Sequence, residues 1–187
     1  MKFVIEHLEA LLSPWLKIEY KEISTIVGKR NLIFTNIKRK NKFFFKLGTT
    51  QPWSITTKPY PKMIILDPTA SQELRPQDCN THNYLVFGGI LGDYPPRQRT
   101  KESITSKLHT STRNLGTIQM STDTAVRVAK MICNGKKLGE IPFMDHVSIE
   151  LGQYEAVDLP YRYVQDTQGK PILAKGLIAY LKAKRRF

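Results

Sequence analysis

Short runs of apolar, β-branched and aromatic residues recur along the chain and alternate with longer amphipathic segments. Each run holds three or four consecutive apolar positions, which is typical of strands that are buried on both faces. Four runs predict strands at 3–5, 32–34, 63–66 and 84–87, and we expect a fifth strand at 112–115. Strands that alternate with amphipathic helices predict an α/β fold with a parallel sheet flanked by helices.

Two segments have both the period and the end signals of helices. The first has Ser13 as its N-cap, Pro14 at the first helical position and Gly28 just past its end. The second covers residues 123–132, and Gly135 closes it. Further elements are a short helix at 100–108, extended segments at 141–144, 147–151 and 159–164 with a turn near residue 152, and a last helix at 172–184.

One polar residue interrupts the apolar side of the first helix. Glu19 lies in the middle of an arc at 100° per residue that is otherwise formed by Leu12, Trp15, Leu16, Ile23 and Ile26. Carboxylates are rarely buried without a partner, so Glu19 either pairs with a cation or faces a cleft. A rim position beside a lysine or arginine is the simpler of these two alternatives.

Glycine-bearing turns follow two of the predicted strands, and an aspartate follows a third. Gly88 and Gly89 come after the fourth strand, and Leu115 and Gly116 come after the fifth. Asp67 comes after the third strand. Because ligands of parallel sheets bind beyond the carboxyl ends of the strands, we expect these turns to form one small-molecule pocket.

The charge balance indicates acidic partners. The 187 residues, which we expect to form a single domain over 1–187, contain 29 Lys and Arg against 16 Asp and Glu, a net charge of +13. This excess predicts contact with ribosomal RNA, although a solvated lysine surface gives the same total. The segment 38–46 mixes lysines with three phenylalanines, which suits either single-stranded nucleic acid or an edge strand protected by lysines.

Several classes of protein are excluded by missing motifs. There is no GxGxxG, GxxxxGK[ST] or GxSxG pattern, so no dinucleotide, nucleoside triphosphate or serine-hydrolase fingerprint exists. Cys79 and His82 have a metal-like spacing without a second pair, so we expect no metal. Cys79 and Cys133 are too few for a disulfide framework, and no run of 18 apolar residues occurs, which predicts a cytoplasmic protein with no membrane contact.

Residues 87–101, FGGILGDYPPRQRTK, resemble the signature loop of a small eukaryotic and archaeal group within the SPOUT methyltransferase superfamily. Residues 115–125 resemble the second motif of the same group, and the similarity covers nearly the whole chain. Residues 36–62 are shorter and more basic than the group's pattern. The resemblance implies a parallel sheet with a C-terminal deep trefoil knot that holds S-adenosylmethionine, without a metal.

The resemblance also implies a set of site residues. The first motif and the turn after the fifth strand would hold the adenosine, and the start of the following helix would hold the rest of the cofactor. The candidate cofactor-binding residues are Asp67, Pro68, Phe87, Gly88, Gly89, Ile90, Leu91, Gly92, Leu115, Gly116, Ile118, Gln119, Met120, Thr122, Asp123 and Thr124.

Four residues are candidates for catalysis. Glu19 and Asp93 carry carboxylates that can align a guanidinium and accept its proton. Arg97 and Arg99 would clamp the cofactor carboxylate or an acidic substrate group, or would tie the loop to a carboxylate such as Asp67.

Three functions follow from these observations. The resemblance implies a monomeric protein arginine N-methyltransferase that acts on a small-subunit ribosomal protein. An RNA methyltransferase of the same fold is the alternative that the net charge and the lysine-aromatic segment favour. A non-catalytic RNA-binding protein that keeps the pocket is the third.

Overall fold

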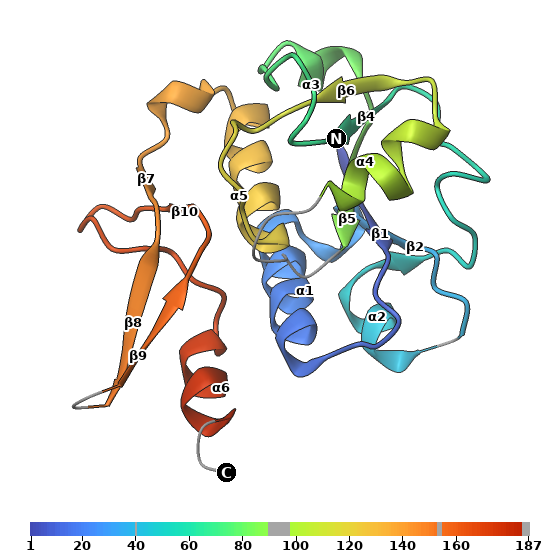
Figure 1. Ribbon diagram of the computed structural model, residues 1–187. Coiled ribbons are helices and arrows are strands. Elements are labelled where there is room, and N and C mark those ends of the chain that lie inside the picture. Colours follow the sequence, from blue (N-terminus) through green and yellow to red (C-terminus); the bar gives the residue numbers. More distant parts are fainter. Residues whose placement is uncertain (40, 90–97, 153–154, 185–187) are drawn as a thin grey trace.

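A parallel sheet forms the centre of the molecule (Figure 1). The computed structural model describes residues 1–39, 41–89, 98–152 and 155–184. Six strands of this part pair in the order β3-β2-β1-β5-β4-β6, and every pair is parallel. The predicted parallel α/β fold is therefore confirmed. The strands are β1 (Lys2–His7), β2 (Leu32–Thr35), β3 (Thr49–Thr50), β4 (Met63–Leu66), β5 (Tyr84–Gly89) and β6 (Ser111–Arg113).

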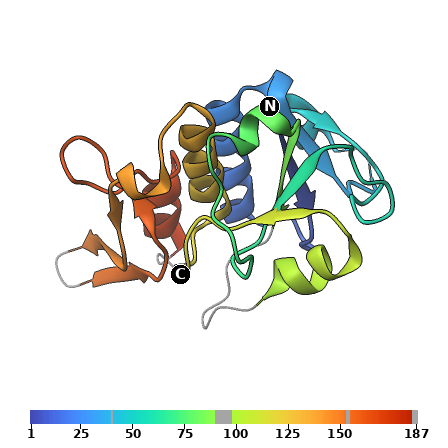
Figure 2. The same ribbon diagram turned by 90° about the horizontal axis from the view of Figure 1, so that it is seen from above.

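Successive residues of the central strands pack on opposite faces of the sheet. Phe3 and Ile5 belong to the larger core, which includes apolar side chains of α1 (Pro14–Val27), α2 (Lys42–Leu47) and α5 (Thr122–Cys133). Val4 packs on the other face with side chains of the segment 55–63 and of the region around α4 (Arg99–Ser103) and η2 (Thr105–Lys107). Helices α1 and α5 lie side by side on one face of the sheet (Figure 2).

Helix α1 begins and ends where its end signals predict. The Ser13 hydroxyl accepts a hydrogen bond from the backbone N–H of Leu16 at 3.1 Å, and Pro14 is the first helical residue. Gly28 adopts a positive φ of 78°, and its N–H donates to the carbonyl of Ser24. The predicted second helix corresponds to α5. None of the helices in the described ranges is long and apolar enough to cross a membrane.

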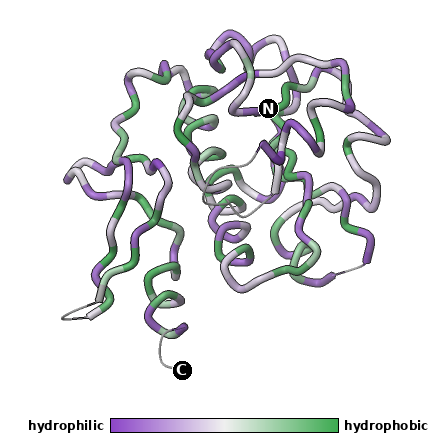
Figure 3. The backbone as a smooth tube through the Cα atoms, viewed as in Figure 1, coloured by the Kyte–Doolittle hydropathy of each residue, from purple (hydrophilic) through white to green (hydrophobic). Residues whose placement is uncertain are grey.

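The C-terminal part forms a layer of its own. Strands β8 (Val147–Gly152) and β9 (Glu155–Leu159) pair as an antiparallel hairpin, and β7 (Phe143–Met144) pairs with β10 (Tyr163–Val164). Along the hairpin, apolar and polar residues alternate (Figure 3). Its apolar side and α6 (Leu177–Lys184) pack against Trp15 and Ile18 of α1. Helices α1 and α5 therefore stand between this layer and the sheet (Figure 1).

The last helix is shorter than predicted. The sequence suggested a helix over 172–184, but α6 begins at Leu177. The N–H of Ile172 donates to the carbonyl of Val164 at 2.8 Å, which extends the pairing beside β10. Gly176 adopts a φ of +94°, which is not helical, so residues 172–176 form a connection between β10 and α6.

The basic segment is not an edge strand. Residues 42–47 form α2, and the side chain of Asn41 caps it by accepting a hydrogen bond from the N–H of Phe43 at 2.9 Å. The ring of Phe44 is buried against Phe34, Tyr20 and His7. The edge-strand alternative is therefore wrong, because Phe44 completes the core as a helical residue while β3 takes the sheet edge.

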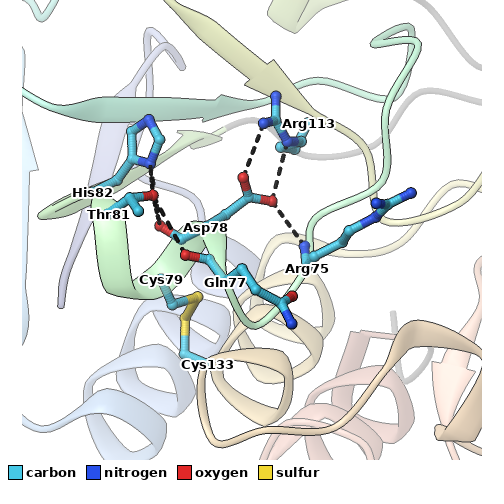
Figure 4. The surroundings of a disulfide bond; sticks show 8 residues. All are labelled: Arg75, Gln77, Asp78, Cys79, Thr81, His82, Arg113 and Cys133. Carbon is cyan, nitrogen blue, oxygen red and sulfur yellow. Dashed lines mark hydrogen bonds and ion pairs between the residues drawn. A yellow bond between two sulfur atoms is a disulfide. The ribbon is translucent and has the colours of Figure 1, made fainter.

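The two cysteines, which the sequence argument did not expect to pair, form a disulfide (Figure 4). Cys79 lies in α3 (Asp78–Thr81) and Cys133 is the last residue of α5, with 5.4 Å between their Cα atoms. Next to Cys79, the carboxylate of Asp78 accepts two hydrogen bonds from the guanidinium of Arg113, the last residue of β6. The bond therefore links α5 to the segment that supports the end of β6.

Reducing this disulfide should destabilise the protein. The bond closes a loop of 54 residues, and loops of this size give about 2–4 kcal/mol of stabilisation when they are cross-linked. Urea unfolding with and without a reductant measures the difference. The double variant Cys79→Ser/Cys133→Ser is the control, because reductant should no longer change its stability. A wild-type protein that is equally stable under both conditions contradicts the prediction.

Candidate active site

The strand ends that were expected to form a pocket lie beside one another. Strands β5, β4 and β6 are neighbours in the sheet, so their carboxyl ends share one edge. The N–H of Asp67 donates to the carbonyl of Arg113 at 2.9 Å. The buried carboxylate of Asp67 accepts two hydrogen bonds from Thr69 through Oδ1, whereas Oδ2 has no partner in the described part of the chain.

The turn after β6 is held from two sides. Gly116 has a φ of +92°, which favours glycine, and its N–H donates to the side chain of Asn114 at 2.9 Å. On the other side, the carbonyl of Gln119 accepts a hydrogen bond from the N–H of Arg162 at 2.9 Å. The guanidinium of Arg162 is in turn held by two hydrogen bonds to Asp145. The turn is therefore fixed between β6 and the C-terminal layer.

A cluster of buried polar side chains lies where the N-terminus of α5 meets the middle of α1. Thr122, Asp123 and Thr124 are all buried, and the hydroxyl of Ser121 donates to that of Thr124 at 2.9 Å. Glu19 is only 3% exposed.

One oxygen of the Glu19 carboxylate is held and the other is not. Trp15 Nε1 donates to Glu19 Oε1 at 2.8 Å, while Glu19 Oε2 has no hydrogen-bond partner among the described residues. Neither Glu19 nor Asp123 forms an ion pair with a cation of the described ranges. Arg127, whose charge acts on Asp123, instead pairs with Glu22 at 2.6 Å.

Burial dominates the electrostatics of the two carboxyl groups. It raises the pKa of Glu19 well above its usual value, and the charge of Asp123 raises that pKa further, against smaller opposing effects of Trp15 and Thr122. Burial also raises the pKa of Asp123 to about 6, against a smaller opposing effect of the neighbouring Ser121 hydroxyl. A cation that entered between them would stabilise both in their charged forms.

The sequence and fold of the chain match one family throughout. Residues 2–186 fit the family model described as "Protein arginine N-methyltransferase SFM1-like". The chain belongs to this family. The predicted S-adenosylmethionine-dependent methyltransferase is thereby confirmed.

A curated relative and solved structures agree with the family. The SFM1-like chain is 36% identical to protein arginine N-methyltransferase SFM1 of Saccharomyces cerevisiae, over 97% of this chain and 94% of the relative. The yeast enzyme complexed with SAH gives a TM-score of 0.88 at 36% identity, covering 97% of this chain and 94% of that chain. Its complex with SAM gives 0.87 at 36% identity, covering 98% and 90%.

A more distant likeness concerns the fold alone. The dual-specific Trm10 from Thermococcus kodakaraensis is 16% identical to the SFM1-like chain, with a TM-score of 0.53. The likeness covers 75% of this chain and 96% of that chain.

The predicted site residues fall into distinct groups. Glu19 meets the start of α5, so the alternative of a rim position beside a lysine or arginine is wrong. At the sheet edge, the side chains of Asp67 and Leu115 are buried, while Ile118 is 36% exposed. The predicted residues near them are Pro68, which is exposed, and Gly116, Gln119 and Met120, which are half-buried.

The first motif is described only in part. Phe87 is buried and stacks on Phe3, so its side chain belongs to the core. Gly88 is half-buried and pairs with Glu6 of β1. Arg99 forms an ion pair with Glu9 at 3.2 Å, so it does tie the loop to a carboxylate, but not to Asp67. The predicted residues Ile90, Leu91, Gly92, Asp93 and Arg97 lie outside the described residues.

Gly89 is a glycine for a packing reason. A Cβ at this position would lie 2.5 Å from the Tyr20 hydroxyl oxygen, 2.7 Å from Ile5 Cγ2 and 2.9 Å from the Glu6 carbonyl oxygen. The space beside the Cα of Gly89 is therefore taken by α1 and β1. This close approach brings α1, and Glu19 with it, onto the sheet.

The sequence pointed to Glu19 and Asp123 but not to the side chains beside them, Trp15 and Tyr163. The spacing of Trp15 and Glu19 by four residues puts them on one helix face, which is the signal that could have paired them. Tyr163 has no such signal, because a bridge between Met120 and Arg162 brings it beside the N-cap of α5. The sequence predicted an extended segment at 159–164 but not its neighbour.

A side chain at position 89 should disturb the fold rather than ligand binding alone. Gly89→Ala forces α1 away from β5, so we expect the free energy of unfolding to fall by about 1–3 kcal/mol. Gly139→Ala is the matched control, since a Cβ there would meet nothing within 4 Å. Chemical unfolding compares the two, and equal stabilities would contradict this account.

The buried Asp123 should make stability fall as the pH rises. Its folded-state pKa of about 6 lies above the ordinary value of 3.8, so the folded protein holds the proton more tightly than the unfolded chain does. Raising the pH from about 4 through 6 then destabilises the wild type relative to Asp123→Asn by a few kcal/mol, on the order of 2–3. Denaturant unfolding across this range measures the difference.

Asp166→Asn is the control of opposite sign. The backbone N–H groups of Lys170 and Gln168 hold the pKa of Asp166 below its usual range. Its contribution to stability is therefore present at neutral pH and is lost as the pH falls. If the difference between wild type and Asp123→Asn does not change with pH, the burial of a titrating Asp123 is refuted.

Proposed function

We propose that this SFM1-like protein transfers a methyl group from S-adenosylmethionine to a guanidinium nitrogen of an arginine in a protein substrate. One observation favours arginine as the substrate residue. The carboxyl groups of Glu19 and Asp123 are both buried, and neither forms an ion pair with a lysine or arginine of the described ranges. A guanidinium is always charged and offers five planar N–H donors. It supplies the positive charge that both groups lack and a hydrogen bond for Glu19 Oε2.

The sheet edge fits the cofactor. The buried Oδ2 atom of Asp67 has no hydrogen-bond partner among the described residues, so it can accept a hydrogen bond from a hydroxyl or amino group of a nucleoside. The turn at Leu115 and Gly116 lies beside it, and Thr122 begins the helix next to Glu19. When bound, S-adenosylmethionine supplies an electrophilic methyl group on a sulfonium.

The residues of the chain then have separate tasks. Methyl transfer is an in-line displacement, so holding the guanidinium in line supplies much of the acceleration. The nitrogen must also lose a proton. Glu19 is suited to accept it, because burial raises the pKa of this residue and so makes its carboxylate a stronger base. Trp15 fixes Glu19 through Oε1 and leaves Oε2 for the substrate.

The substrate we propose is a small-subunit ribosomal protein, and the enzyme acts as a cytoplasmic monomer. The resemblance of residues 87–101 and 115–125 supports this substrate, and a net charge of +13 suits an enzyme that contacts ribosomal RNA while it works. An acceptor site lined by carboxylates favours an arginine over a phosphate-rich RNA. RNA methylation is therefore the alternative function, and the labelling experiment below distinguishes it from arginine methylation.

The proposal extends to the class of the fold. The resemblance implies a SPOUT α/β knot, and the likeness to Trm10 supports the same class at the level of the fold. In that class the knot would be built from the segments around the first motif and α5. A crystal structure that traces residues 90–97 tests this point.

The experiment that tests the function uses radiolabelled S-adenosylmethionine. The purified protein is incubated with small ribosomal subunits from cells that lack the enzyme, and the product is divided between nuclease and protease. We expect label that survives nuclease, is lost with protease, and appears in methylarginine after acid hydrolysis. Label that is lost with nuclease instead identifies RNA as the acceptor and refutes the proposal.

Glu19→Gln should remove transfer and spare the cofactor. The amide keeps the shape and can still accept from Trp15, but it cannot take a proton, so we expect kcat to fall at least about 100-fold. Affinity for S-adenosylmethionine, measured by calorimetry, should change little. Glu73→Gln is the control, because that side chain is exposed. Unchanged turnover in Glu19→Gln removes Glu19 from the mechanism.

A further inference from the structure

Tyr163 carries a hydroxyl whose position the fold itself does not explain. Its side chain is only 1% exposed, yet the hydroxyl oxygen has no hydrogen-bond partner in the described ranges. Leaving a buried hydroxyl unpaired costs stability, and a phenylalanine would fill the same place without this cost. Such a group points to a partner outside the chain.

The backbone brings Tyr163 to the start of α5. Arg162 pairs in parallel with Met120, so the next residues, Tyr163 and Ser121, lie beside each other. The hydroxyl of Ser121 donates to that of Thr124 at 2.9 Å, and no hydrogen bond within the described ranges meets the distance and angle limits at the Tyr163 hydroxyl. The ring of Tyr163 is part of the apolar core of the C-terminal layer, which fixes its direction.

The charges of the site's carboxyl groups act on the phenol. After burial, the charges of Asp123 and then Glu19 are the largest causes that raise the pKa of Tyr163. Two buried oxygen atoms without a hydrogen-bond partner, Glu19 Oε2 and the Tyr163 hydroxyl, therefore belong to residues that lie at the start of α5. They come from different elements packed around α5, one from α1 and one from β10.

We propose that the Tyr163 hydroxyl is a further acceptor for the substrate guanidinium and holds it in line between Glu19 and Asp123. This proposal rests on the proposed arginine methylation. A guanidinium has more N–H donors than the free oxygen of Glu19 can accept, and a neutral oxygen adds an acceptor without adding another buried charge. Lysine has no planar fork to meet three acceptors, so Tyr163 also favours arginine over lysine.

Tyr163 positions the substrate and is not the base. Its pKa is raised by burial and by the nearby carboxylates, so the phenol keeps its proton and remains neutral. Proton removal stays with Glu19. The contribution of Tyr163 is therefore a hydrogen bond to a charged group, and its loss should affect the substrate protein and spare S-adenosylmethionine.

The test compares Tyr163→Phe with Tyr60→Phe. Both tyrosines have a buried hydroxyl without a described partner, but Tyr60 stacks on Tyr84 at the amino end of β5. Steady-state methylation of small ribosomal subunits from cells that lack the enzyme gives kcat and KM. Thermal unfolding and calorimetry with S-adenosylmethionine give stability and cofactor affinity.

We expect kcat/KM of Tyr163→Phe to fall about 10- to 100-fold, the loss typical of one hydrogen bond to a charged group. Its melting temperature should stay equal to or above that of the wild type, and its affinity for S-adenosylmethionine should not change. Tyr60→Phe should keep full turnover. A lowered melting temperature with a matching loss of cofactor affinity would instead assign Tyr163 a structural role and overturn the proposal.

The outcomes distinguish the role of Tyr163 from the proposed arginine methylation on which it rests. If the wild type labels arginine and Tyr163→Phe does so equally well, the role of Tyr163 is refuted and the function stands. If the wild type labels no arginine at all, both are refuted together.

Discussion

The structure depends on two carboxyl groups that are buried where α1 meets α5. Glu19 and Asp123 are each only 3% exposed, and burial raises the pKa of both. Burying them is unfavourable unless they remain partly protonated or gain a cation. The N-terminus of α5 and the indole N–H of Trp15 offset part of this cost. A site of this kind favours a cation, and the proposed substrate guanidinium would supply it.

Several distant segments cooperate to maintain this junction. Gly89 lets α1 approach the sheet, because a Cβ there would meet Tyr20 and β1. The C-terminal layer packs its apolar side on Trp15 and Ile18. Arg162 joins that layer to the turn that ends at Met120. The sheet, α1 and the C-terminal layer therefore all meet around the start of α5, which explains why residues far apart in the sequence serve one site.

Much of the fold could be predicted from local signals. The ends of α1 follow from Ser13, Pro14 and Gly28, and the central strands follow from uninterrupted apolar runs. Local signals fail where tertiary contacts decide. Phe44 is drawn into the core as part of a helix, and Ile172 uses its N–H beside β10. The pairing of Cys79 with Cys133 depends on how α3 lies against α5, which no spacing reveals.

The candidate site was predictable in outline for a related reason. Parallel strands bring Asp67 and Leu115 to one edge by topology alone, and the misplaced carboxylate of Glu19 marks its helix face as unusual. What the sequence cannot supply is the set of charges around that carboxylate. A surface with a net charge of +13 favours acidic partners, whereas the buried site favours a cation. These preferences agree if the basic surface contacts RNA while the acidic site receives an arginine from a protein bound to that RNA.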